Sequence, residues 1–307
     1  MDLPLVIYNK RSLLGIVGSQ PISLPPATLW ASFEHARRIA ASLGSHDPES
    51  SLAAYWSFST RIQQWQQIID RVTLAKAGQL RFVEVGSGMG LFVLTGKALG
   101  FDVVGVESST NRYESSLGIA RSLFQANALP LTLIQAYSET LPLPSASVDV
   151  VASFQTFEHV AELRNTLSEI RRILKPGGLL FAQAPNYRSF YEAHYGIFAP
   201  LALGKSWLKL YLRLRGRPTE FLAHLQWLSP AALRTMAREV GFSSIEIMPI
   251  PGPGDSTEKL PTVPFSSPFK SRRGSVSLRL AYLLARLFKV LRVDSELYPQ
   301  LQIWATA

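Results

Sequence analysis

The sequence predicts an α/β protein built on a mostly parallel sheet with helices on both faces. Two observations indicate this fold. From residue 81 onward, short apolar runs typical of strands alternate with helical patterns, as in repeated strand–helix–strand units. The first of these strands runs into a glycine-rich segment, Glu84–Gly90, which leads directly into a helical pattern. A turn of this kind is typical of a ligand-binding loop.

The residues before the alternation predict an arm followed by two helices. Residues 1–27 hold no strand or helix period for long, so we expect a mostly irregular arm. Apolar residues at helical spacing predict a helix over 28–43. A second helix is expected to begin at the cap residue Asp47, with proline next, and to run toward Lys76. Its aromatic side chains are expected to pack against the sheet, or else to cover a ligand: Tyr55, Trp56 and Trp65.

The alternating part and the C-terminal part supply the remaining elements. Strands are expected at 81–85, 102–106, 131–134, 148–152, 178–183, 244–248 and 301–305. Helices are expected at 89–99, 110–126, 160–174, 229–240 and 276–292. The aromatic-rich stretch 187–228 interrupts the alternation, and we interpret it as an insert that covers a substrate. Residues 251–275, rich in Pro, Gly and Ser, are expected to form a loop.

Composition and charge narrow the classes of function. The chain has 307 residues, no cysteine and a formal net charge of +9. The lack of cysteine excludes disulfides, thiolate metal sites and a cysteine nucleophile. No signal peptide and no spanning apolar stretch is visible, so we expect a cytoplasmic protein. Residues 187–307 carry a net charge of +8 against +1 for residues 1–186, which predicts an anionic partner for the C-terminal part.

The glycine-rich segment and the next strand together predict a nucleotide-type site. Glycines at alternate positions permit positive φ and let backbone N–H groups approach a ligand. Glu107 ends the second strand, where a carboxylate can accept hydrogen bonds from both hydroxyls of a ribose. The alternative is an ordinary turn from strand to helix.

Five segments, in this order, resemble the motifs of class I S-adenosylmethionine-dependent methyltransferases, in the broad subgroup that includes the ubiquinone and menaquinone biosynthesis methyltransferases. The segments are Glu84–Gly90, Glu107, Ser138–Pro144 with Ser147–Val151, Phe157–Val160 and Leu174–Leu180. The resemblance implies a Rossmann-like seven-stranded, mostly parallel sheet with its last strand antiparallel, an N-terminal helical extension and a helical cap insert. The expected parts are the arm and helices (1–78), the cofactor-binding core (79–186), the cap insert (187–228) and a C-terminal part with a basic helix that completes the sheet (229–307).

The resemblance also implies the residues that bind the cofactor, S-adenosylmethionine. They are Glu84, Gly86, Ser87, Gly88, Gly90, Glu107, Ser108, Ser138, Glu139 and Gln155. Tyr137 departs from the family pattern, because the family commonly has an acid there for the adenine amino group. The adenine contacts are therefore expected from backbone groups or from Ser138 and Glu139. No metal site is expected.

Few catalytic residues are needed, because the cofactor supplies an activated methyl group. A general base helps if the acceptor is a hydroxyl or an acidic carbon, and His159 is the histidine in a family-matched position. Its alternative role is a structural hydrogen bond at a helix start. His194 and His224 are second candidates, or else ordinary surface or packing histidines. The segment Ser153–Thr156 lacks the Asn/Asp-Pro-Pro-aromatic motif, which disfavours amide and nucleobase-amine acceptors.

We therefore expect a methyltransferase for a small-molecule or lipid-like acceptor, modified at oxygen or carbon. One alternative is a regulatory protein that binds S-adenosylmethionine without catalysis. Another is an RNA methyltransferase, favoured only by the basic C-terminal part; no nucleic-acid module is recognisable, so a nucleic-acid partner is not expected.

Two amphipathic segments favour peripheral association with an anionic membrane. Lys205, Lys209 and Arg213 recur every fourth residue and share one helix face. A later helix has a leucine stripe with basic residues beside it. The stripe consists of Leu280, Leu283, Leu284, Leu287 and Leu291. The alternative is a helix that packs its stripe on the sheet edge and exposes a solvated basic face.

Overall fold

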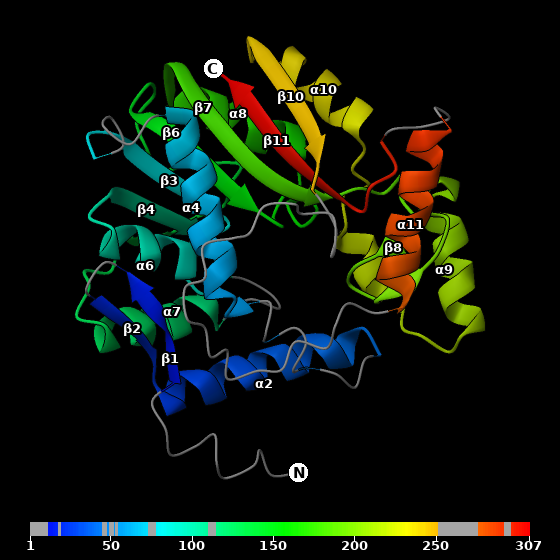
Figure 1. The fold of residues 1–307 in the computed structure, drawn as a ribbon, viewed down its shortest axis with the longest axis horizontal. Coiled ribbons are helices and arrows are strands. Elements are labelled where there is room, and N and C mark those ends of the chain that lie inside the picture. Colours follow the sequence, from blue (N-terminus) through cyan, green and yellow to red (C-terminus); the bar gives the residue numbers. More distant parts are fainter. Residues whose placement is uncertain are drawn as a thin grey trace. The chain divides into compact units, whose positions relative to one another are not determined.

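The computed structural model describes residues 12–17, 20–44, 48, 52, 55–72, 78–109, 115–250, 276–291 and 296–307 (Figure 1). The chain forms two compact units. The first unit contains Met1–Ala41, His46–Tyr137 and Leu260–Ser271, and the second contains Ser42–Ser45, Ser138–Lys259 and Arg272–Ala307. The four-part division expected from the sequence stays a prediction.

A seven-stranded sheet has the strand order β10-β11-β7-β6-β3-β4-β5 (Figure 1). Its strands are β3 (Arg81–Val85), β4 (Asp102–Glu107), β5 (Leu133–Gln135), β6 (Val148–Phe154), β7 (Leu174–Pro185), β10 (Ser244–Pro249) and β11 (Gln300–Thr306). The pairs β3/β4, β4/β5 and β6/β7 are parallel, and β11 pairs antiparallel with both β7 and β10. The expected mostly parallel sheet with an antiparallel last strand is confirmed.

The expected helices are present within the described residues. They are α2 (Pro26–Ser42), α4 (Phe58–Val72), α6 (Leu91–Ala98), α7 (Ser116–Ala126), α8 (Leu163–Ile173), α10 (Pro230–Glu239) and α11 (Val276–Val290). Ser229 caps α10, because its side chain accepts a hydrogen bond from the Ala232 amide. The predicted helix start at Asp47, its predicted end at Lys76 and the predicted loop 251–275 lie outside the described residues.

The prediction of a mostly irregular arm over 1–27 is wrong for its described part. Residues Ser12–Val17 (β1) and Gln20–Leu24 (β2) pair as an antiparallel hairpin. The Asn127 side chain secures β2: its Oδ1 accepts from the Ser23 amide at 2.7 Å, and its Nδ2 donates to the Ser23 carbonyl at 2.9 Å. A partner about a hundred residues away in the sequence leaves no local pattern, which explains the failure.

Trp65 of α4 packs in the core of the first unit, as expected. Its ring stacks on Phe92 with centroids 4.2 Å apart, and its Nε1 donates to the Phe92 carbonyl at 3.0 Å. A Cβ on Gly96 would lie 2.2 Å from the Trp65 ring, so only glycine lets α6 approach this closely. This contact fixes helix α6, whose first turn follows the glycine-rich segment.

The expected insert, 187–228, contains both strand and helix. Its elements are β8 (Tyr191–Glu192), β9 (Ile197–Phe198), the 3-10 helix η2 (Leu201–Leu203), α9 (Lys205–Leu214) and the 3-10 helix η3 (Glu220–His224). Strands β8 and β9 form a short antiparallel pair. The expectation of a helical insert is therefore met in α9, while β8 and β9 form a hairpin.

Candidate active site

The glycine-rich segment forms a turn between β3 and α6 with left-handed backbone. Gly86, Gly88 and Gly90 have φ angles of 76°, 52° and 76°, which residues with a Cβ rarely adopt. A Cβ on Gly88 would meet nothing within 4 Å. Helix α6 begins directly after Gly90. The turn thus presents an open backbone surface at a helix start, as a ligand-binding loop requires.

Glu107 holds this turn from the end of β4. Its Oε2 accepts a hydrogen bond from the Gly88 amide at 2.7 Å, and its Oε1 accepts one from the Ser109 amide at 3.1 Å. Each carboxylate oxygen has a second lone pair, so the carboxylate can still accept from ribose hydroxyls. Its role as a ribose ligand stays a prediction, and its role in positioning the loop is an addition to it.

Glu84 lies in β3 and is 4% exposed. Burial raises the pKa of its carboxyl to about 8; the charge of Arg61 from α4 lowers that pKa, and Glu107 raises it. Among the described residues, neither Glu84 Oε2 nor the buried Ser87 Oγ has a hydrogen-bond partner. These two buried polar atoms lie beside an open glycine turn, which indicates a ligand with hydrogen-bonding and cationic groups.

These groups fit S-adenosylmethionine. Its ammonium group and its sulfonium are cationic and would compensate the buried Glu84 carboxylate. The open side of Gly88 admits close backbone approach, and Glu107 keeps lone pairs for hydroxyl groups. The residues expected to bind the cofactor in Glu84–Gly90 and at Glu107 lie in the first unit, and their contact with the cofactor stays a prediction.

The side chains expected near the adenine hold the start of α8 instead. Glu139 Oε1 accepts from the backbone amides of Ala161 and Glu162, at 2.9 and 3.2 Å. Ser138 Oγ donates to Glu139 Oε2 at 3.1 Å. These contacts explain why α8 begins at Leu163, later than expected. Tyr137 is 57% exposed, and the adenine contacts of Ser138 and Glu139 stay predictions.

Two further candidates lie at strand ends. Gln155 follows β6 with φ of 52°, a left-handed conformation unusual for a residue with a Cβ, and its Nε2 donates to Gln300 Oε1 at 2.8 Å. Ser108 follows β4, and its carbonyl accepts from Gln135 Nε2 at 3.3 Å. The contacts of both residues with the cofactor stay predictions.

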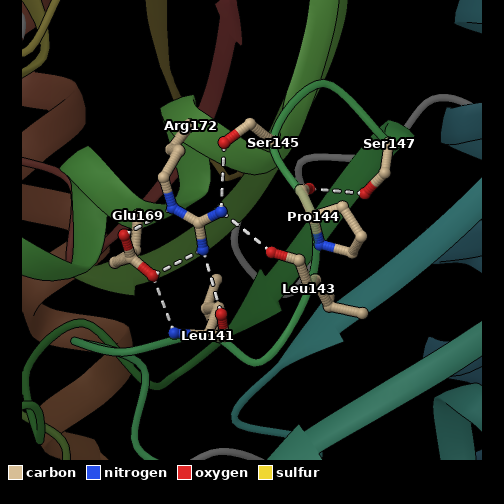
Figure 2. A network of polar contacts seen from close by, with 7 residues as sticks. All are labelled: Leu141, Leu143, Pro144, Ser145, Ser147, Glu169 and Arg172. Carbon is tan, nitrogen blue, oxygen red and sulfur yellow. Dashed lines mark hydrogen bonds and ion pairs between the residues drawn. The ribbon is translucent and has the colours of Figure 1, made fainter.

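The segment after Ser138 is held by one arginine (Figure 2). Arg172 Nε and Nη2 donate to the two oxygens of Glu169 at 2.7 and 2.8 Å. The same guanidinium donates to the carbonyls of Leu141 and Leu143, at 2.9 and 2.8 Å, and to Ser145 Oγ at 3.3 Å. Glu169 Oε2 also accepts from the Leu141 amide. Helix α8 therefore determines the path of the loop that resembles the family's adenine-side motif.

His159 and His194 meet in the second unit. His194 Nε2 lies 3.3 Å from His159 Nε2, although the two residues are 35 positions apart. His159 follows β6, and His194 lies between β8 and β9. The Phe221 ring contacts both imidazoles, with centroids 5.9 Å from His159 and 5.0 Å from His194. The structure thus brings together the two predicted catalytic residues, whereas His224 in η3 is exposed and lies outside this pair.

Two buried glutamates complete this cluster, which we call the histidine cluster (Glu158, His159, Glu192 and His194). Glu192 Oε1 lies 2.7 Å from His194 Nδ1, and its Oε2 accepts from the Tyr195 amide at 2.7 Å. Burial alone would lower the pKa of His194, but the charge and hydrogen bond of Glu192, with the charge of Glu158, raise it overall. Burial raises the pKa of Glu158 to about 7, against the charge of His194.

Tyr187 lies beside the histidine cluster and stacks on Trp227, with ring centroids 4.3 Å apart. Burial raises the pKa of its hydroxyl well above the ordinary value, and Glu192 and Glu158 raise it further. The hydroxyl therefore stays protonated and can donate. It has no hydrogen-bond partner among the residues that the structure describes.

Sequence reasoning missed Glu158, Glu192 and Tyr187. Glu158 and His159 are adjacent, and Glu192 precedes His194 by two positions, so a search for carboxylates beside each histidine would have found both glutamates. Tyr187 belongs to an aromatic-rich stretch and gives no signal that separates it from packing residues.

Comparisons with known proteins agree with this geometry. Residues 83–182 match the family described as methyltransferase domain. The ubiquinone biosynthesis O-methyltransferase of Sinorhizobium medicae is 30% identical over 120 residues, which cover 39% of this chain and 46% of that protein. The enzyme of the same name from Cereibacter sphaeroides is 26% identical over 167 residues, covering 54% of this chain and 62% of that protein. The chain thus spans less than two thirds of either relative.

A solved structure of a SAM-dependent methyltransferase from Archaeoglobus fulgidus is similar with a TM-score of 0.46 and 17% identity, over 80% of this chain and 94% of that one. Residues 83–182 therefore form a methyltransferase domain, and this match supports both the resemblance to the class I S-adenosylmethionine-dependent methyltransferases and S-adenosylmethionine as the cofactor.

Proposed function

We propose that this protein methylates a hydroxyl group of a small, lipid-like aromatic acceptor of the quinone type. One observation carries the proposal: two imidazoles, at 3.3 Å from each other, are held by a buried carboxylate in the second unit. Such a pair can take the proton that a hydroxyl loses on methylation. The matched relatives are ubiquinone biosynthesis O-methyltransferases, which supports oxygen as the acceptor atom and a quinone-like acceptor.

The chain's own residues have three tasks in this reaction. When bound, the cofactor supplies an electrophilic methyl group on a sulfonium. Glu107 and the glycine turn hold the nucleoside, and Glu84 compensates positive charge. The imidazole of His159 would accept the proton that the acceptor hydroxyl gives up. Glu192 stabilises positive charge on the paired His194, as the aspartate does in a catalytic triad.

The acceptor class can be tested with radiolabelled methyl donor and a panel of acceptors. We expect labelling of a catechol with a polyprenyl tail, weaker labelling of the same catechol without the tail, and none of the corresponding aromatic amine. Labelling of the amine alone would contradict the proposal. Binding of the donor with no labelling of any acceptor or cell extract would instead support the regulatory alternative.

We further propose that the second unit associates peripherally with an anionic membrane. Four of the five leucines in the α11 stripe do not pack in the core: Leu280, Leu283, Leu287 and Leu291 are 41%, 61%, 48% and 60% exposed, and Leu284 is half-buried. The helix packs instead through its small and aromatic residues. These are Ala281, Tyr282 and Ala285. An exposed apolar stripe flanked by basic residues is the arrangement of interfacial helices.

Helix α9 has the same character. Leu208 and Leu212 are fully buried, whereas Leu210 and Leu214 are 58% and 78% exposed. Trp207 stacks on Tyr211 with centroids 5.3 Å apart, and Lys209 and Arg213 are exposed. Among the described residues no helix is long and apolar enough to cross a membrane. Surface binding by α9 and α11 would suit an enzyme whose acceptor lies in lipid.

A further inference from the structure

We propose that Glu158, His159 and His194 form a binding site for a divalent transition-metal ion, with Zn²⁺ as the best match, and that Glu192 orients His194 for this purpose. The proposed function requires only the metal-free imidazole as a base, so the metal site goes beyond it. With an ion bound, the two Nε2 atoms are ligands, and the ion takes over from His159 the task of activating the acceptor hydroxyl. The lack of cysteine excludes thiolate ligands, but not a site built from imidazole and carboxylate.

The distances suit one shared ion. His159 Nε2 and His194 Nε2 are 3.3 Å apart, and His159 Nε2 lies 3.8 Å from Glu158 Oε1. One ligand atom from each of the three residues lies within 4.8 Å of the others. Two nitrogens bound at about 2.0–2.1 Å to a tetrahedral Zn²⁺ are themselves about 3.3 Å apart. The imidazoles therefore already stand at the separation that a common ion imposes.

Glu158 supplies an independent sign that a cation is expected here. Its carboxylate is 1% exposed, and in the described part of the chain its Oε2 has no hydrogen-bond partner. Glu192 is equally buried and lies in the same cluster. Two buried carboxylates beside two imidazoles carry excess negative charge when ionised, and a divalent ion would compensate it.

Glu192 would not bind the ion itself but would orient His194, which does. It contacts His194 through Nδ1, at 2.7 Å, which leaves Nε2 as the ligand atom that faces His159. Metal-binding histidines usually donate their second nitrogen to a carboxylate, and this contact fixes the ring and increases its basicity. The Tyr195 amide donates to the other oxygen of Glu192, so the orienting carboxylate is itself held in place.

The donor set selects the class of metal. Two imidazoles and one carboxylate suit Zn²⁺ and other first-row transition metals, whereas Mg²⁺ and Ca²⁺ prefer oxygen ligands. Three protein ligands leave a coordination position open, as in catalytic rather than structural zinc sites. The side chains of His159 and His194 are 21% and 16% exposed, so the site can be reached. A bound ion would lower the pKa of an acceptor hydroxyl, and this role alone rests on the proposed function.

Metal binding can be measured directly. The full chain, without a histidine tag and freed of metal by chelation, would be titrated with Zn²⁺ by calorimetry and with Co²⁺ by visible absorption. We expect one ion per chain and the intense absorption of low-symmetry Co²⁺. His194→Ala should abolish binding, and Glu192→Gln should weaken it by about 10–100-fold. His224→Ala removes an exposed imidazole outside the cluster and should leave binding unchanged.

Thermal unfolding and binding of S-adenosylhomocysteine would establish that each variant is folded. If His194→Ala does not fold, Glu192→Gln, which preserves shape, decides the question. Absence of binding by the wild type, or equal binding by wild type, His194→Ala and Glu192→Gln, would overturn the site. Methyl transfer without metal binding would overturn the metal site alone, and metal binding without methyl transfer would overturn only the proposed function.

Discussion

Glu84 and Glu107 belong to the paired strands β3 and β4, but their surroundings differ. Glu107 accepts hydrogen bonds from the backbone amides of Gly88 and Ser109. Glu84 is buried with one oxygen lacking a partner among the described residues, and burial favours its neutral form. Glu107 thus positions the loop, whereas Glu84 is the glutamate that a cationic ligand would stabilise.

The first prediction concerns the pH dependence that Glu84 creates without ligand. Its pKa is raised to about 8 in the folded chain, from an ordinary 4.5. Between these values the folded state binds more protons than the unfolded state, so stability falls as pH rises through this window. Glu84→Gln should remove this contribution. The free energy of unfolding of the variant, relative to that of the wild type, should therefore be higher at pH 9 than at pH 5 by a few kcal/mol. Urea unfolding at pH 5 and pH 9 measures the difference in free energy between variant and wild type, and an equal difference at both pH values would contradict a buried carboxyl with a raised pKa.

The second prediction concerns His159. His159→Ala should lower kcat by roughly a hundredfold, because the acceptor hydroxyl loses its proton acceptor. The affinity for S-adenosylhomocysteine should stay unchanged, since the cofactor residues lie elsewhere in the sequence. Initial rates and calorimetry measure the two effects. His224→Ala serves as the control and should keep the wild-type rate. A wild-type rate in the His159 variant would show that this imidazole is not the base.

Among the elements, the loop after Ser138 is held by the hydrogen bonds of the planar Arg172 guanidinium. Arg172→Lys keeps the charge but loses the planar set of donors, so bonds to two carbonyls and one oxygen of Glu169 cannot all be made. We expect the free energy of unfolding to fall by about 1–2 kcal/mol. Chemical denaturation measures this loss. Arg238→Lys, at an exposed position of α10, is the control and should change little; equal effects of both would contradict the role of the guanidinium.

The elements that the sequence predicts well are those with local signals. Strands β3 and β4 are apolar runs bounded by turn residues, and α10 has its cap and proline in adjacent positions. The hairpin β1–β2 was missed because Asn127 holds it from a distant position. In α11 the spacing of the leucines correctly predicted a helix, but it does not reveal which face of that helix is buried. Small residues, Ala281 and Ala285, let that face pack closely, and four of the five stripe leucines remain exposed.

The candidate site was predictable in part for the same reason. The glycine turn and Glu107 follow from short motifs, and His159 from its place after a strand. The pairing of His159 with His194 depends on how the hairpin β8–β9 folds back, which no spacing in the sequence encodes. Glu192 and Tyr187 join the site through that same fold. For Ser138 and Glu139 the sequence showed the motif but not the contacts. In the structure Glu139 holds the start of α8, and Ser138 donates to Glu139.

At the scale of the whole molecule, the uneven charge predicts salt-sensitive binding to anionic vesicles. Residues 187–307 carry a net charge of +8, and each basic residue near an anionic leaflet contributes about 1 kcal/mol. Sedimentation with vesicles should recover the chain with anionic but not neutral lipid at low salt, and less at high salt. Lys205/Lys209/Arg213→Glu and Leu283/Leu287→Ser should each reduce recovery.

Arg121→Glu, an exposed substitution in the first unit, is the control for charge and should leave recovery nearly unchanged. Equal recovery of wild type and both sets of variants would contradict membrane binding by α9 and α11. The basic surface would then serve solubility or an anionic substrate.

The central claim is that the glycine turn of the first unit binds the methyl donor, and calorimetric titration with S-adenosylhomocysteine tests it. Gly88→Val adds volume on the open side of the turn and should weaken binding at least tenfold. Gly100→Val is the matched control, because Gly100 also has positive φ, of 84°, and an open Cβ position, but lies after α6. The account predicts micromolar binding by the wild type and the Gly100 variant and its loss in the Gly88 variant. Equal binding by all three, or none by the wild type, would contradict it.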